Sequence, residues 1–191
     1  LQKASKDEES VLYKTDNHLL VNHNEMLKIY WEIAAQTEFL HKKDFQKPTP
    51  FINQMVKNKR QADIVFVDEA QLLLSQVNHF RAENQLEELL KLTKVLVIAV
   101  DFKQVVKLKS YWSKGMLLRH LAGHAVQTMQ LKQQLRMQDQ KVAEWIDSFV
   151  AGKLLPLPQT REYDLQIFPD GQPLFSWVKQ HDKQSGLARV L

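Results

Sequence analysis

The sequence contains no cysteine and very little glycine, and each shortage excludes a kind of site. Without cysteine there is no disulfide scaffold, no Cys-ligated zinc or iron–sulfur site and no thiol nucleophile. Only five glycines occur, and none precedes Gly115. A glycine-rich phosphate-binding loop is therefore excluded from the first 114 residues. There is also no run of eighteen apolar residues, so we predict no membrane-spanning segment and expect a cytoplasmic protein.

The composition is that of an ordinary globular domain. Hydrophobic residues make up 44% and charged residues 25% of the 191 positions, which suffices for a core without covalent cross-links. The chain starts at Leu1 without a methionine, and an apolar stretch reaches its last residue, Leu191. We therefore expect the chain to be part of a longer protein.

The net charge of +4 is unevenly distributed along the chain. Residues 1–100 hold 13 basic and 14 acidic side chains, whereas residues 101–191 hold 13 basic and 8 acidic ones. The segment 102–136 has seven basic residues and no acidic one. Such a segment can bind the phosphates of a nucleotide or of nucleic acid. The alternative is a solvated surface whose acidic partners lie elsewhere in the fold.

Hydrophobic patterns predict strands that alternate with helices. The expected strands are 19–21, 62–67 and 94–100, with weaker candidates at 125–129 and 165–168. The expected helices are 23–34, 50–56, 83–92, 111–121, 139–151 and 174–180. Strands that are apolar on both faces are typical of a parallel sheet covered by helices on both sides. We therefore predict a three-layer α/β fold whose chemistry lies at the carboxyl ends of the strands.

Three helix boundaries carry specific end signals. Asn22, with Glu25 three residues later, has the pattern of a capping box. Thr49 is suited to cap a helix whose first residue is Pro50. Gly152 is placed to end the helix 139–151 in a left-handed conformation.

The strongest chemical signal is a buried strand that ends in two acids. Residues 64–67 are apolar and are followed by Asp68 and Glu69, which together form a Walker B pattern. A carboxylate at the strand tip, Asp68, can hold Mg²⁺ beside the β- and γ-phosphates of ATP. Glu69 can polarise the attacking water. Two solvated acids at a strand end are the alternative, but Ala70 and Gln71 complete the helicase-type sequence Asp-Glu-Ala-Gln.

Two further elements follow in the order expected of a helicase-like ATPase. The strand 94–100 ends in Asp101, with Gln104 three residues later, where such enzymes place a polar sensor of the γ-phosphate. A neutral amide can bond both water and a phosphate oxygen, although Asp101 could equally cap a loop. Gln134 and Arg136 form a Gln-x-Arg element, and the planar charged fork of arginine suits a phosphate. A surface arginine is the alternative.

In this order the motifs resemble the bacterial branch of the Schlafen group-3-like DNA/RNA helicase domain, a family of P-loop ATPases related to superfamily 1 helicases. The resemblance runs over nearly the whole chain and implies a RecA-like core over residues 1–152, with a connector and the start of a further helicase-type segment over 153–191. It also implies ATP with Mg²⁺ and a DNA or RNA partner. The matching motifs are Leu-Val-Asn-His-Asn-Glu-Met (20–26), Lys-Pro-Thr-Pro-Phe-Ile-Asn (47–53), Val-Asp-Glu-Ala-Gln (67–71), Asp-Phe-Lys-Gln (101–104), Gln-Leu-Arg (134–136) and Glu-Trp-Ile-Asp (144–147).

One departure from the family pattern is decisive. The family has a Gly-x-x-x-x-Gly-Lys-Ser/Thr loop ahead of the strand that corresponds to 19–21, but no glycine occurs there. We expect that loop, with the first strand of the sheet, to lie before Leu1. Residues 1–191 alone should then neither bind ATP tightly nor hydrolyse it.

Two functions from different classes remain open. The first is an ATP-driven motor or switch on nucleic acid, in which Asp68 holds Mg²⁺, Glu69 activates water, Gln104 senses the γ-phosphate and Arg136 stabilises transition-state charge. The second is a nucleotide-gated regulatory or interaction module without motor activity.

For two weaker candidate sites, a structural role is the alternative to a functional one. His120 and His124 have the spacing of a helical metal pair but lack a third ligand, so a structural role is favoured. Trp112 could stack on a base, although a buried anchor is favoured.

Overall fold

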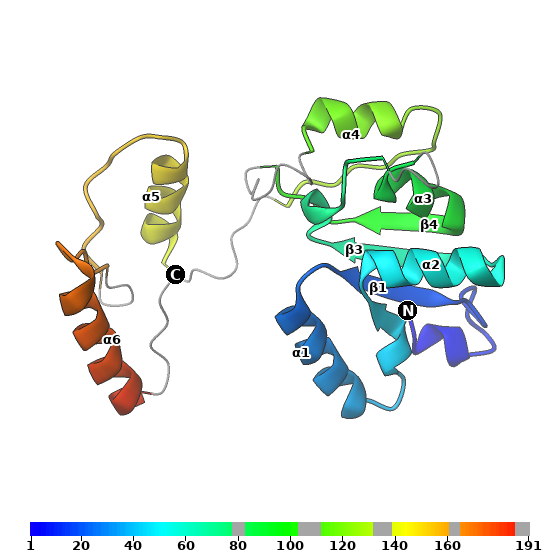
Figure 1. Cartoon of the computed structure of the whole chain (residues 1–191), viewed down its shortest axis with the longest axis horizontal. Coiled ribbons are helices and arrows are strands. Elements are labelled where there is room, and N and C mark those ends of the chain that lie inside the picture. The colour runs from blue at the N-terminus through cyan, green and yellow to red at the C-terminus, as the bar shows by residue number, and fades with distance from the viewer. Residues whose placement is uncertain (78–82, 103–111, 132–138, 161–164, 186–191) are drawn as a thin grey trace. The chain divides into compact units, whose positions relative to one another are not determined.

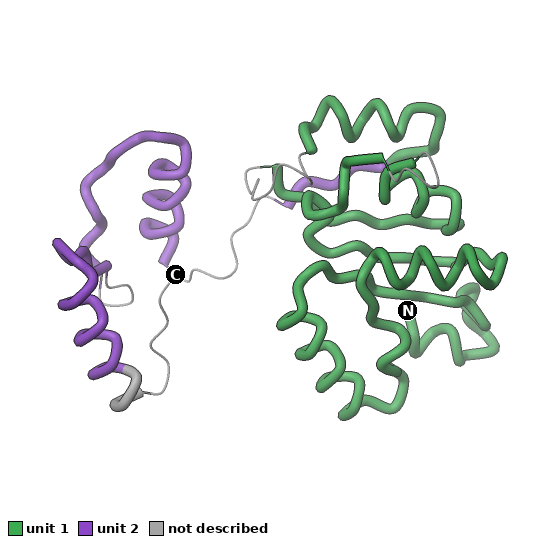
Figure 2. The backbone as a smooth tube through the Cα atoms, viewed as in Figure 1, with its two compact units in different colours: residues 1–126 green, residues 127–191 purple. Residues whose placement is uncertain are grey.

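The computed structural model of the chain describes residues 1–77, 83–102, 112–131, 139–160 and 165–185 (Figure 1). Two compact units, residues 1–126 and 127–191, are distinguished in Figure 2 and are described separately. The described elements of the first unit are η1 (Ala4–Lys6), β1 (Asn17–Val21), α1 (Asn24–Ala35), η2 (Lys42–Asp44), β2 (Phe45–Gln46), α2 (Pro48–Asn58), β3 (Ala62–Asp68), η3 (Ala70–Leu72), α3 (Gln85–Leu92), β4 (Thr93–Ile98) and α4 (Lys114–His120). Those of the second unit are α5 (Gln140–Val150) and α6 (Gly171–Ser185).

The four described strands form one sheet in the order β2-β1-β3-β4, and all neighbouring pairs are parallel. The chain leaves β1 for the edge strand β2 and then returns across the sheet to β3. The direction of winding therefore changes between β1 and β3, which makes this the topological switch point. The predicted α/β fold with a parallel sheet is confirmed.

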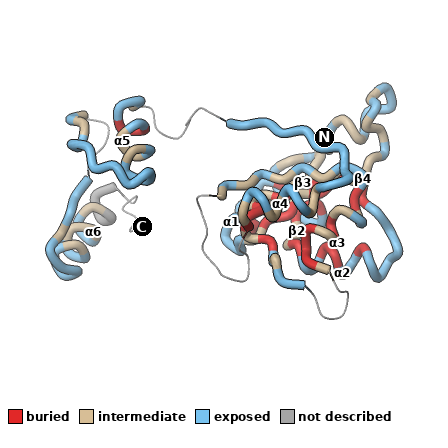
Figure 3. Tube along the Cα trace, turned by 90° about the horizontal axis from the view of Figure 1, so that it is seen from above, coloured by how far each residue is buried: buried red, intermediate tan, exposed pale blue. Residues whose placement is uncertain are grey.

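One face of the sheet carries the larger core (Figure 3). Leu20, Val65 and Val67 point to this face and pack against side chains from α2, α3 and α4. Phe51 of α2 and Leu89 of α3 are fully buried there. Burying side chains of this size stabilises the fold by about 1.5–3 kcal/mol each.

The opposite face is covered only in part. Leu27 and Ala34 of α1 pack on Phe45 of β2, so α1 covers the β1–β2 half. On the β3–β4 half, Val95 is 50% exposed and Val97 is 40% exposed. The prediction of helices on both faces therefore holds fully for one face and for half of the other.

Several element ends differ from the predictions. Helix α1 begins at Asn24, and its N-cap is His23 rather than the predicted Asn22. Helix α2 begins at Pro48, because proline suits the first helical turn, so Thr49 lies inside the helix rather than before it. The short strand β2 was not predicted, because the residues around it in the sequence are polar.

The weaker strand candidates at 125–129 and 165–168 have no regular secondary structure. A short apolar run becomes a strand only where a neighbouring strand accepts its backbone hydrogen bonds, and the described residues offer neither run such a neighbour.

The second unit is small and has little core. Among its described residues only Val142 and Ala143 are buried. Trp145 stacks on Phe149 with ring centres 5.6 Å apart, and its indole N–H donates to the carbonyl of Leu155 at 2.8 Å. The helix α5 ends as predicted, with Gly152 at a φ of +77°. A RecA-like core that extends to residue 152 stays a prediction, since compactness does not define a functional domain.

Candidate functional site at the carboxyl ends of the strands

Asp68 and Glu69 lie where the interior strand β3 ends. Asp68 is the last residue of β3, and its Oδ1 accepts a hydrogen bond from the backbone N–H of Glu69 at 3.0 Å. Glu69 has φ +53° and ψ +50°, the left-handed conformation. A residue with a Cβ pays about 1–2 kcal/mol for this conformation, so the surrounding contacts must offset that strain. Strained backbone of this kind often accompanies function.

Gln71 connects the ends of two neighbouring strands. Its Nε2 donates to the Glu69 carboxylate, and its Oε1 accepts from the backbone N–H of Asp101 at 3.0 Å. Gln71 is only 3% exposed, so its amide lies in the interior while its two partners lie nearer the surface. Glu69 and Asp101 are thus joined through one buried amide.

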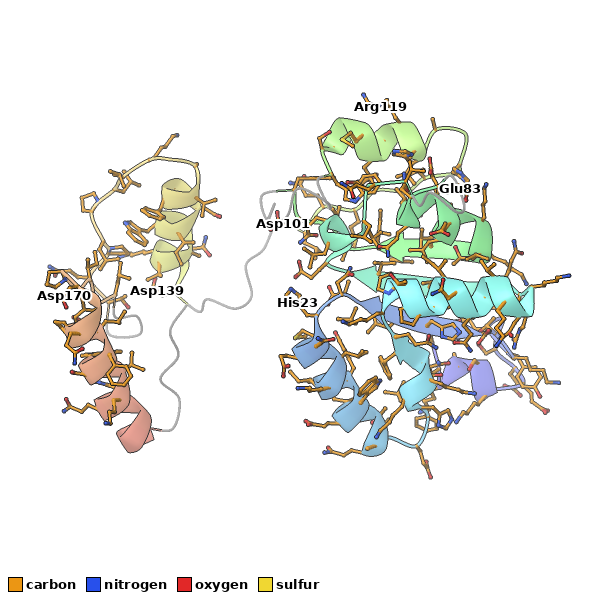
Figure 4. All side chains as sticks on the ribbon, viewed as in Figure 1. His23, Glu83, Asp101, Arg119, Asp139 and Asp170 are labelled. Carbon is orange, nitrogen blue, oxygen red and sulfur yellow. The ribbon has the colours of Figure 1, made fainter. Side chains whose placement is uncertain are left out.

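Backbone hydrogen bonds fix the same junction. The N–H of Ala99 donates to the carbonyl of Val67 at 3.0 Å, and the N–H of Ala70 donates to the carbonyl of Ala99 at 2.8 Å. The chain that leaves β3 is therefore bonded to the chain that leaves β4. Figure 4 labels His23 and Asp101, which follow β1 and β4 at the same end of the sheet.

The end of β1 lies beside this pair of acids. Val21 is the register partner of Asp68, and Asn22 follows it directly. The Nδ2 atom of Asn22 is buried and has no hydrogen-bond partner among the residues described. Unsatisfied buried donors are rare in folded proteins. The Asn22 amide is therefore a hydrogen-bond donor still available at the switch point.

Tyr30 borders the site from α1. Its ring lies flat against Phe45, with centres 5.4 Å apart and planes 8° apart. Burial, and then the negative charge of Asp68, raise the pKa of the Tyr30 hydroxyl above its usual range. Tyr30 is therefore neutral at physiological pH and adds no negative charge beside Asp68.

The carboxylates can hold a cation and accept a proton. No group of three or more His, Asp or Glu side chains suited to a metal occurs in the part of the chain that the structure describes. Mg²⁺ bound with a nucleotide needs only one or two protein carboxylates, since phosphates and water complete its octahedron. Asp68 fits this requirement, because no described residue donates to its second carboxylate oxygen.

Three of the six predicted site residues are thus brought to one end of the sheet: Asp68, Glu69 and Asp101. Gln104, Gln134 and Arg136 lie outside the described residues. The sequence prediction missed the roles of Gln71 and Tyr30. Gln71 stands within the Asp-Glu-Ala-Gln motif, so its position was a usable signal; no local pattern pointed to Tyr30.

Trp112 and His120, from the two weaker candidate sites, have structural roles. Trp112 is 2% exposed, and its indole N–H donates to the carbonyl of Leu73 at 2.8 Å, so it is a buried anchor rather than a stacking platform. His120 packs edge-on against Trp112, and its Nδ1 lies 3.0 Å from the carboxylate of Glu87.

Comparisons with known proteins identify the family of the chain. The family model of the Schlafen group 3 DNA/RNA helicase domain matches residues 1–191. The uncharacterized protein YPL245W of Saccharomyces cerevisiae is 34% identical over 217 aligned positions, which cover 100% of this chain and 48% of the yeast protein. The chain therefore spans about half the length of this relative. No solved structure matches the chain. No described helix is long and apolar enough to cross a lipid bilayer. On the match across its whole length, the chain belongs to the Schlafen group 3 DNA/RNA helicase domain family.

Proposed function

We propose that the chain is part of an ATP-hydrolysing motor or switch that acts on DNA or RNA. The observation that carries the proposal is the acid pair Asp68–Glu69 at the carboxyl end of an interior parallel strand, beside the switch point. Nucleotide-binding α/β proteins use this position for their ligands. The family match adds the expectation of a nucleic-acid partner.

The acids divide the chemistry between them. Asp68 would hold Mg²⁺, which neutralises charge on the phosphates. Glu69 orients a water molecule and accepts its proton as the water oxygen bonds to the γ-phosphorus. The bond from that phosphorus to the β,γ-bridging oxygen breaks, giving ADP and inorganic phosphate. Asp101, Gln104, Gln134 and Arg136 are proposed to contact or sense the phosphates.

The phosphate-binding loop would come from polypeptide outside residues 1–191. Two features of the first unit support this. The outer edge of β4 has no strand partner among the residues that the structure describes. The sheet face beside it carries the exposed side chains of Val95 and Val97. A further parallel strand on that edge, with its crossover helix, would cover both.

By the handedness of parallel connections, that helix would lie on the incompletely covered face. A connection from outside β4 to β1 crosses the sheet in the same direction as the connection from β1 to β2. Since such connections are right-handed, its helix must lie on the same face as α1. The flank of α1 away from Trp31, which bonds the β2 backbone, carries the exposed apolar residues Met26, Ile29 and Ile33. These three side chains would line one side of the surface on which the proposed crossover helix packs.

The test uses the full-length protein and Glu69→Gln, a variant that keeps the shape of the side chain and removes the base. We expect ATP hydrolysis that DNA or RNA stimulates, and a loss of about 100-fold or more in kcat for the variant. Glu32→Gln, an exposed change on α1, is the matched control and should keep full activity.

Two other outcomes would change the assignment. Nucleotide binding without turnover in the wild-type protein would favour the nucleotide-gated module over the motor. Full hydrolysis by Glu69→Gln would remove the acid pair from the mechanism.

A further inference from the structure

The junction between β3 and β4 depends on one buried glutamine, and its chemistry goes beyond support of the fold. Gln71 lies in η3, directly after β3, and reaches Glu69 with its amide nitrogen and the Asp101 backbone with its amide oxygen. No charge is involved on the glutamine itself. An amide is an uncharged side-chain group that both donates and accepts in fixed directions.

The two hydrogen bonds determine each other's direction. The N–H of Asp101 is a donor, so it requires the amide oxygen of Gln71. The NH₂ group must then face the carboxylate of Glu69. This donor holds one oxygen of the Glu69 carboxylate, which leaves the other oxygen for water.

We propose that Gln71 is a positioning residue that couples the orientation of Glu69 to the backbone at the end of β4. This rests on the proposed function, in which Glu69 is the base for ATP hydrolysis. A displacement of the chain at Asp101, as on sensing of the phosphate, pulls on the amide oxygen of Gln71. The amide nitrogen then turns the Glu69 carboxylate into or out of its productive orientation, so hydrolysis follows the state of the β4 end.

The full-length protein offers a direct test in Gln71→Met, which keeps the length of the side chain and removes both hydrogen bonds. We expect kcat for ATP to fall about tenfold to a hundredfold, as for other losses of orientation, while KM changes less than about threefold. The chain provides a matched control in Gln85, a second buried glutamine. Its Oε1 accepts from the N–H of Leu74 and its Nε2 donates to Oγ1 of Thr49, both at 2.8 Å.

Gln85→Met should lower the melting temperature about as much as Gln71→Met but leave kcat within about twofold of wild type. Equal losses of kcat in the two glutamine variants would show that Gln71 acts through stability alone, and would overturn the inference.

Failure of the inference is distinguishable from failure of the proposed function. If wild type hydrolyses ATP, Glu69→Gln does not, and Gln71→Met keeps kcat within about threefold, then Glu69 acts without the help of Gln71 and only the inference falls. If wild type is inactive, or Glu69→Gln is fully active, the proposed function falls and takes the inference with it.

Discussion

A lysine at position 97 gives the sharpest test of the incompletely covered sheet face. Val97 lies on β4, is 40% exposed, and pairs in register with Phe66 of β3. In the chain of residues 1–191, Val97→Lys removes an apolar side chain that is about 60% buried, which costs about 1–2 kcal/mol. The lysine can extend its ammonium group from the open sheet face into water.

The cost is far larger if a helix from elsewhere in the polypeptide covers this face. The ammonium group would then be buried without a partner, at a penalty of several kcal/mol. We therefore expect Val97→Lys to leave residues 1–191 folded but to abolish nucleotide binding, or folding of the first unit, in the full-length protein. Urea denaturation of residues 1–191 and calorimetric titration of the full-length protein with Mg²⁺–ATP measure the two effects.

Val56→Lys is the matched control, because Val56 is 46% exposed on α2, on the other side of the sheet. It should be tolerated in both polypeptides. Equal behaviour of the two lysine variants in the full-length protein would mean that the β3–β4 face is not covered there, and would refute the proposed place of the crossover helix.

Three smaller predictions follow from single contacts. Asn84→Ala should destabilise the first unit by about 1–2 kcal/mol in urea denaturation, because Oδ1 of Asn84 caps the N–H of Glu87 at 3.0 Å; an unchanged midpoint would contradict this. The pKa of the Asp63 carboxyl lies below its usual range because it accepts hydrogen bonds from a backbone N–H and from Lys94. A lowered pKa gives stability that is present above the unfolded value of about 4 and is lost as pH falls through the folded value, so Asp63→Asn should flatten the acid side of the stability curve. Glycine normally stabilises a folded protein less than alanine does, by about 0.5–1 kcal/mol. Because Glu69 has a left-handed backbone, Glu69→Gly should nevertheless be more stable than Glu69→Ala in thermal unfolding.

The parallel sheet could be predicted because its strands carry continuous apolar runs, a pattern typical of parallel sheets. Residues 62–67 gave β3 almost to its true end at Asp68. The acids at the strand ends followed from the same argument, since chains of parallel strands emerge at one edge. Strand β2 could not be found in this way, because a two-residue edge strand has no period to detect.

The contacts within the site were hidden for a different reason. The hydrogen bond from Asp101 to Gln71 joins residues 30 positions apart, and no local pattern encodes it. The left-handed backbone of Glu69 was equally invisible, because glutamate has no preference for that conformation. Sequence periodicity predicts which side chains enter a core, whereas the geometry of a site depends on which chain ends the fold brings together.

The negative charge of the site indicates that the phosphates are bound by polypeptide other than the described acids. Asp68 and Glu69 are both acidic, and phosphates repel carboxylates, so these residues suit a cation and a water molecule better than the nucleotide itself. Tight phosphate binding requires backbone N–H groups or basic side chains aimed at the anion. The glycine-free sequence before Gly115 cannot supply a P-loop, and the basic segment 102–136 follows the acids in the chain. The described acids can therefore direct hydrolysis only when another segment holds the phosphates, which is why the catalytic proposal and the proposed cover of the β4 edge depend on each other.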